Sequence, residues 1–132
     1  MKRAVIADTG PLFAAADPDD AHHQRAVREI EKLDRERMEV VIPYPTLMEA
    51  YTLVLYRLGA RTAFVWLSEM EDATLLNPTP EDFRQAFLRA PGLPDQKITL
   101  FDTTLAALSK RLNVPVWTYD HHFDLLRVPI WR

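Results

Sequence analysis

The 132-residue chain contains no cysteine, which excludes disulfide bonds and metal sites built on thiolates. It also lacks an apolar run long enough to cross a bilayer, and its N-terminus lacks the pattern of a secretory signal peptide. We therefore expect a cytoplasmic protein with no membrane partner. An excess of positive charge is missing too, since the formal net charge is -3, and this argues against a general basic coat for nucleic acid.

Glycine is scarce, with three residues in the chain, and no Gly-rich phosphate loop, G-x-S-x-G motif or His-x-x-x-His pair occurs. These absences argue against a P-loop nucleotide site, a serine nucleophile and a zinc site. The tripeptide Asp8-Thr9-Gly10 is found in aspartic proteases. Those proteins are all-β, however, whereas this chain has several strong helical segments, so we give the protease interpretation little weight.

The segments that are present alternate between short apolar runs and helical patterns, without repeats or linkers. The apolar runs predict strands at residues 4–7, 40–43, 74–77 and 114–118, with an edge strand at 128–131. Helical spacing predicts helices at 12–16, 21–39, 44–58, 60–70, 81–89 and 99–112, and residues 90–95 predict a loop. This order predicts one α/β domain over residues 1–132, with a mainly parallel sheet covered by helices on both faces.

Acidic residues follow the ends of the predicted strands. Asp8 ends the first strand, Asp120 comes just after the fourth, and Glu49 is predicted in the first turn of the helix after the second. Because each loop at the carboxyl end of a parallel strand leads into the start of a helix, topology places these three at one sheet edge. Asp102, at the start of the helix over 99–112, joins them if that helix start leans toward this edge.

Carboxylates crowded together repel one another and take up protons, and a hard divalent cation removes that penalty. Mg²⁺ and Mn²⁺ prefer oxygen ligands, and such an ion can activate water and neutralise a phosphate during an in-line displacement. The four acids therefore suggest phosphoryl-transfer or phosphodiester chemistry.

Each acid alone has a simpler explanation. Thr46 with Glu49, and Thr99 with Asp102, have the spacing of capping boxes that satisfy backbone N–H groups at a helix start. Asp8 and Asp120 are each suited to beginning a turn. The four histidines, which form the pairs 22–23 and 121–122, are interpreted as surface residues, with the second pair a secondary candidate for contacting substrate phosphate. The common location of the acids raises the set above these explanations.

The acids and their surroundings resemble the PIN domain family. The resemblance spans nearly the whole chain, keeps the acidic elements in order, and is carried by Val5-Ile6-Ala7-Asp8-Thr9, by Glu49, by Leu100-Phe101-Asp102-Thr103-Thr104-Leu105-Ala106-Ala107-Leu108 and by Val116-Trp117-Thr118-Tyr119-Asp120-His121-His122-Phe123. The last two blocks are the more specific.

The resemblance implies a PIN-like α/β/α domain and an endoribonuclease that depends on Mg²⁺ or Mn²⁺. Asp8, Asp102 and Asp120 match metal positions, Glu49 would bind the metal or orient the attacking water, and Thr118 matches a hydroxyl residue that supports Asp120 or a nearby water. The family further implies in-line displacement of the 3′ oxygen, which leaves a 5′ phosphate. Small members of VapC type are toxins of toxin–antitoxin pairs, so an antitoxin partner, an RNA substrate and a homodimer are expected.

Two departures and two alternatives accompany this resemblance. Gly10-Pro11 stands where many members have serine or alanine, which puts substrate contacts from this loop in doubt, and Asp124 lies close enough in sequence to assist or replace Asp120. A catalytically inactive RNA-binding module and a DNA nuclease remain alternatives, the latter ranked last because extra helical elements are lacking. The apolar helix over 60–70, which includes Trp66, is explained by core packing or by a homodimer contact.

Overall fold

The computed structural model describes residues 3–93 and 97–132. Its centre is a four-stranded parallel sheet with the strand order β3-β2-β1-β4. The strands are β1 (Ala4–Ala7), β2 (Glu39–Pro43), β3 (Thr74–Leu76) and β4 (Val116–Trp117). The chain runs outward from β1 to β3 and then returns to the other side of β1 for β4. The strand order therefore reverses between β1 and β4, which is where ligands bind in open parallel sheets.

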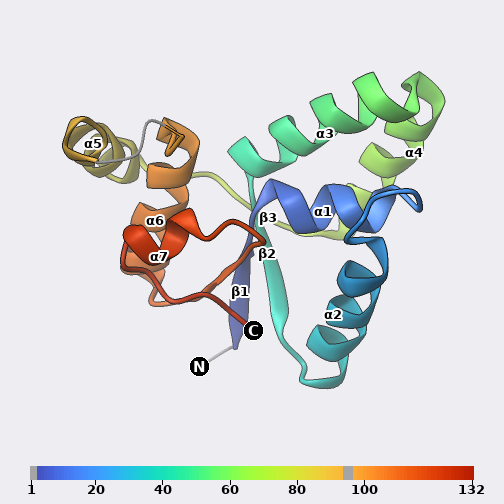
Figure 1. Cartoon of the computed structure of the whole chain (residues 1–132), viewed down its shortest axis with the longest axis horizontal. Helices are drawn as coiled ribbons and strands as arrows, with labels where there is room; N and C mark the ends of the chain where they lie inside the picture. The colour runs from blue at the N-terminus through green and yellow to red at the C-terminus, as the bar shows by residue number, and fades with distance from the viewer. Residues whose placement is uncertain (1–2, 94–96) are drawn as a thin grey trace.

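Helices cover both faces of this sheet, and Figure 1 shows α1 to α4 on one side and α5 to α7 on the other. This arrangement confirms the predicted α/β/α class. Of the described helices, none is long and apolar enough to cross a membrane. The helices are α1 (Thr9–Ala16), α2 (His23–Arg35), α3 (Tyr44–Leu58), α4 (Ala60–Glu69), α5 (Pro80–Arg89), α6 (Leu100–Leu112) and α7 (His122–Leu125), with 3₁₀ turns η1 (Met70–Asp72) and η2 (Ala90–Gly92).

Alternate residues of β1 feed two separate cores, because successive side chains of a strand point to opposite faces. Val5 and Ala7 pack into the core beneath α1 to α4, whereas Ile6 packs into the core beneath α6 and α7. All three side chains are fully buried. The continuous apolar run at the start of the chain is thus explained by burial on both faces, as expected of a central parallel strand.

The structure differs from the predicted boundaries mainly where the chain must turn. Helix α2 ends at Arg35 rather than 39, because Arg37 adopts a positive φ of 55° and the chain then enters β2. The fourth strand is shorter than predicted, and the predicted tail strand is a single parallel bridge between Val116 and Ile130. The predicted loop at 90–95 begins with η2, and its positions 94 and 95 lie outside the described residues.

Candidate metal centre

Asp8 follows β1 directly and is buried, with 7% of its surface exposed. It is the N-cap of α1, and its Oδ1 accepts a hydrogen bond of 2.8 Å from the backbone N–H of Thr9. Its other oxygen, Oδ2, accepts a bond of 2.7 Å from the Thr118 hydroxyl. Asp8 is thus a helix N-cap rather than the turn residue that its sequence context suggested, and it is also a member of the acidic group.

Thr118 connects the ends of the two strands at the switch point. While its hydroxyl donates to Asp8, the same oxygen accepts a hydrogen bond of 2.9 Å from the backbone N–H of Asp120. Asp120 in turn accepts a bond of 2.9 Å from the backbone N–H of His122, and the same Oδ1 lies 3.0 Å from His122 Nδ1. These contacts fix Asp120 relative to Asp8, and the bond between Thr118 and Asp8 joins residues that are 110 positions apart along the chain.

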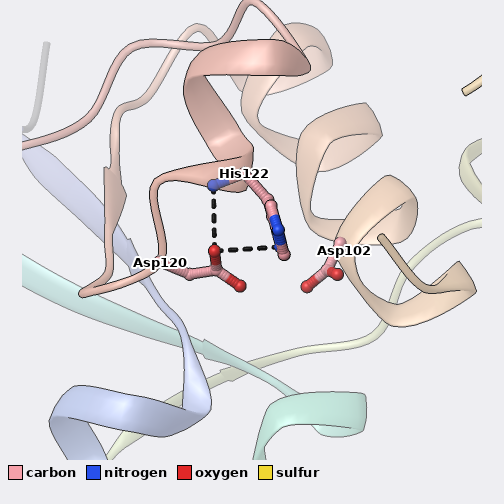
Figure 2. Close-up of side chains that lie close together, drawn as sticks. All are labelled: Asp102, Asp120 and His122. Atoms are coloured by element: carbon pink, nitrogen blue, oxygen red, sulfur yellow. Dashed lines mark hydrogen bonds and ion pairs between the residues drawn. The ribbon is translucent and has the colours of Figure 1, made fainter. Parts of the chain in front are cut away.

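Asp102 lies in the first turn of helix α6, and one of its oxygens caps the start of that helix. Its Oδ2 accepts hydrogen bonds from the backbone N–H of Thr99 at 2.9 Å and from the Thr99 hydroxyl at 3.2 Å, and this confirms the predicted capping box. Figure 2 shows the carboxylate facing Asp120 across a gap beside the His122 ring. The cap and the position at the acidic group are therefore compatible, because they use the carboxylate in different directions.

Glu49 approaches the other acids from helix α3. That helix begins at Tyr44, so Glu49 lies in its second turn rather than its first. The predicted capping box between Thr46 and Glu49 is wrong, because Thr46 lies inside the helix and donates a bond of 3.0 Å to the carbonyl of Ala7. This buried contact ties the start of α3 to the end of β1, and it places Glu49 near Asp8.

One cavity of about 570 Å³ brings these side chains together. Its lining includes all four predicted acids, Asp8, Glu49, Asp102 and Asp120. Thr118 is buried behind them, in contact with Asp8. Asp124 instead pairs with Arg132 at 3.7 Å on an exposed surface. Among the described residues, it does not line this cavity.

Burial, together with the charges of neighbouring carboxylates, raises the pKa of Asp8, Glu49 and Asp102. Burial raises the pKa of Asp8 from 3.8 to about 6, with a further contribution from the charges of Asp102 and Asp120, while bonds from Thr118 and Thr9 oppose the rise. Burial and the Asp102 charge also raise the pKa of Glu49. The pKa of Asp102 is raised by burial and by Asp120, against the opposing hydrogen bonds from Thr99. A cation bound among them would relieve this repulsion.

The donor set fits a hard divalent ion. Ligand atoms of Asp102, Asp120 and His122 all lie within 4.8 Å of one another, and the remaining acids line the same cavity. Oxygen donors in this number suit Mg²⁺ or Mn²⁺. These side chains could therefore hold the ion that the resemblance implies.

His122 is the residue of this group that sequence reasoning missed. It was interpreted as a surface residue, and this is wrong, because 7% of its surface is exposed. His121 is exposed, as predicted, and lines the cavity, so it remains available for contacting substrate. The two rings lie against each other, with centroids 4.7 Å apart, although His121 precedes α7 and His122 begins it. Only the spacing of two residues from Asp120 could have indicated which one is buried.

A family model described as PIN domain matches residues 5–128. The chain belongs to the PIN domain family. This confirms the resemblance drawn from the motifs. A search of curated proteins found no significant match.

Several solved structures share the fold of this chain over nearly their whole length. VapC20 from Mycobacterium tuberculosis, described as a sarcin–ricin loop cleaving toxin, has a TM-score of 0.83 at 20% identity, covering 97% of this chain and 98% of that one. VapBC2 from Rickettsia felis, bound to promoter DNA, has a TM-score of 0.72 at 13% identity, covering 98% and 97%. FitAcB from Neisseria gonorrhoeae gives 0.69 at 19% identity, covering 97% and 96%. At these identities the similarity shows the fold alone.

Proposed function

We propose that this PIN domain protein is a metal-dependent endoribonuclease and the toxin of a type II toxin–antitoxin pair. The observation that carries the proposal is the meeting of Asp8, Glu49, Asp102 and Asp120 in one cavity at the switch point of the sheet. The fold similarity to VapC20, whose description names cleavage of the sarcin–ricin loop, supports RNA as the substrate class.

In this proposal Asp8, Asp102 and Asp120 hold Mg²⁺ or Mn²⁺, and His122 either joins them or fixes Asp120. The ion, when bound, neutralises the phosphate and lowers the pKa of water. Thr118 is a positioning residue, because its hydroxyl contacts both Asp8 and the backbone of Asp120.

Glu49 is the candidate base or additional ligand. It is the most exposed of the four acids, and its pKa is raised by burial and by Asp102. A raised pKa makes its carboxylate a better acceptor for a proton from the attacking water. Attack in line with the 3′ oxygen would leave a 5′ phosphate on the product.

The expected partners are an antitoxin and a second copy of the chain. Two of the structural neighbours are VapBC2 and FitAcB, the first of them bound to promoter DNA, and these fold similarities support an antitoxin partner. For the homodimer, helix α4 has apolar side chains on two faces. Trp66 is buried in the core, whereas Phe64 is 64% exposed on the surface. We propose the exposed part of α4 as the homodimer contact and the cytoplasm as the location of the pair.

The proposal is tested by measuring RNA cleavage with Mn²⁺, with Mg²⁺ and with chelator. Wild-type protein should cleave with an ion and stop in chelator, and Asp102→Asn should lose cleavage while remaining folded, because Asn can still accept the capping bond from Thr99. Asp124→Asn, a nearby exposed acid outside the cavity lining, should retain activity. Cleavage that persists in chelator would refute the metal mechanism. RNA binding without cleavage under any of these conditions would favour the inactive module.

A further inference from the structure

A second cavity of about 350 Å³ lies next to the acidic one. The two share the side chains of Tyr119, Asp120 and His121 in their linings. The second cavity differs in its charge, because Arg25 and Arg132 also line it. A cavity with two guanidinium groups therefore adjoins the cavity that carries the four acids.

Arg25 is held in place by a network beneath this cavity. Its guanidinium lies 4.1 Å from the centre of the Tyr119 ring, and its Nε lies 3.5 Å from Glu29. Glu29 also accepts hydrogen bonds from the Tyr119 hydroxyl at 2.6 Å and from Trp117 Nε1 at 3.2 Å. Glu29 thus anchors both the arginine and the aromatic ring on which the arginine is stacked.

This network leaves part of Arg25 accessible. A guanidinium has five donors in a planar fork, and the contact with Glu29 involves its Nε. The Arg25 side chain is 46% exposed, so the contact with Glu29 leaves part of the arginine open to solvent. An arginine already ordered by stacking loses less conformational freedom when it binds an anion.

The other cation of the cavity is also available to an anion. Arg132 pairs with Asp124 at 3.7 Å, and both side chains are mostly exposed. A surface pair of this kind contributes little energy, so a bound anion can compete with Asp124 for the guanidinium. His121, which is exposed at the junction of the two cavities, adds a further donor.

We propose that the second cavity binds the phosphate next to the one that is cleaved, with Arg25 as the main contact. The inference rests on the proposed ribonuclease function, because an RNA strand whose reacting phosphate lies at the acids must place a neighbouring phosphate close by. Arginine matches phosphate geometry with two parallel hydrogen bonds. The subsite therefore sets the register of the strand relative to the acids.

The test measures binding of a short fluorescein-labelled single-stranded RNA by anisotropy over a series of KCl concentrations, with Ca²⁺ present. Arg25→Ala should weaken binding about tenfold, as expected for a lost hydrogen bond to a charged group. It should also reduce the slope of log affinity against log salt by about 0.7, the value for one phosphate contact in a single strand. The affinity of Arg25→Lys should lie between those of the wild type and Arg25→Ala. The control variant Arg84→Ala, which removes a surface arginine of α5, should bind RNA like the wild type.

A substrate change separates phosphate contact from a structural effect on Tyr119. The same RNA is prepared with a neutral methylphosphonate at each linkage in turn. At one linkage, next to any mapped cleavage site, the methylphosphonate should weaken binding by the wild type. The same substitution should abolish the difference in affinity between wild type and Arg25→Ala. If no linkage does so, or if Arg25→Ala binds like the wild type, the subsite is refuted even when cleavage is observed. If such a linkage is found but the wild type cleaves nothing, the phosphate contact of Arg25 stands, whereas the nuclease proposal and the position of the subsite next to a cleaved phosphate both fail.

Discussion

Replacing Asp8 by Asn should make the metal-free protein more stable at neutral pH. Asn is close to Asp in shape, and its carbonyl can still accept the bond from the Thr9 N–H, while its amide faces the Thr118 hydroxyl, which can accept. The substitution therefore removes the buried charge with little change in contacts. A more stable variant that cannot hold the ion is the expected signature of a site kept for function.

The magnitude follows from the pKa of Asp8, which is raised from 3.8 to about 6. In the folded state Asp8 keeps its proton at pH values where the unfolded chain has lost it. Its contribution to stability is thus fully present below pH 3.8 and is lost as pH rises through about 6. The loss is about 3 kcal/mol at neutral pH, because one pH unit corresponds to about 1.4 kcal/mol. Asp8→Asn should therefore raise the melting temperature at neutral pH by roughly 10 °C.

The assay is urea or thermal unfolding in chelator at acid and neutral pH. The free energy of unfolding of the wild type should fall as pH rises from 3.8 through about 6, and that of Asp8→Asn should fall less. Asp82 is the control of opposite sign: burial raises its pKa, but bonds from Arg111 and Thr79 outweigh this and hold the pKa below its usual value. Asp82→Asn should lose stability at neutral pH, and less at low pH. An Asp8→Asn variant with wild-type stability at neutral pH would refute the reasoning.

Two further predictions concern positioning and assembly. Thr118→Val should weaken Mn²⁺ binding by about tenfold or more in calorimetry, because it removes the hydroxyl that orients Asp8 and Asp120, whereas Thr118→Ser should keep most of the affinity. If α4 forms the homodimer contact, Phe64→Glu should shift the protein to monomer in light scattering, with Phe87→Glu on α5 as the matched exposed control. Equal masses for wild type and Phe64→Glu would exclude α4.

The acidic group was predictable from sequence because its members stand at positions that topology controls. Asp8 and Asp120 follow strands, and parallel strands bring their carboxyl ends to one edge whatever the details of packing. Topology placed Glu49 at the same edge, and the Thr46 contact with the Ala7 carbonyl holds the start of α3 there. Asp102 needed one further condition, that the start of α6 leans toward this edge. Local spacing indicated its capping contact with Thr99 but not that direction.

The remaining features depend on contacts between distant residues, which no local pattern encodes. Glu29 lies on a polar helix and is indistinguishable there from the other acids until Trp117 and Tyr119 are seen to donate to it. His122 is buried because α7 turns directly after Asp120, and a short turn of this kind gives no periodic signal. On α4, helical spacing puts Trp66 and Phe64 on different faces, but because both faces carry large apolar residues it could not say that Trp66 is the one in the core.

The divided use of Asp102 has a consequence for judging related sequences. Because one of its oxygens caps α6, selection for folding alone would preserve an acidic or amide residue at this position in a lineage that had lost catalysis. Glu49 begins no helix and caps none, so folding places a weaker constraint on it. In a set of homologues, loss of the equivalent of Glu49 beside a retained Asp102 would therefore be the earlier mark of a decayed enzyme.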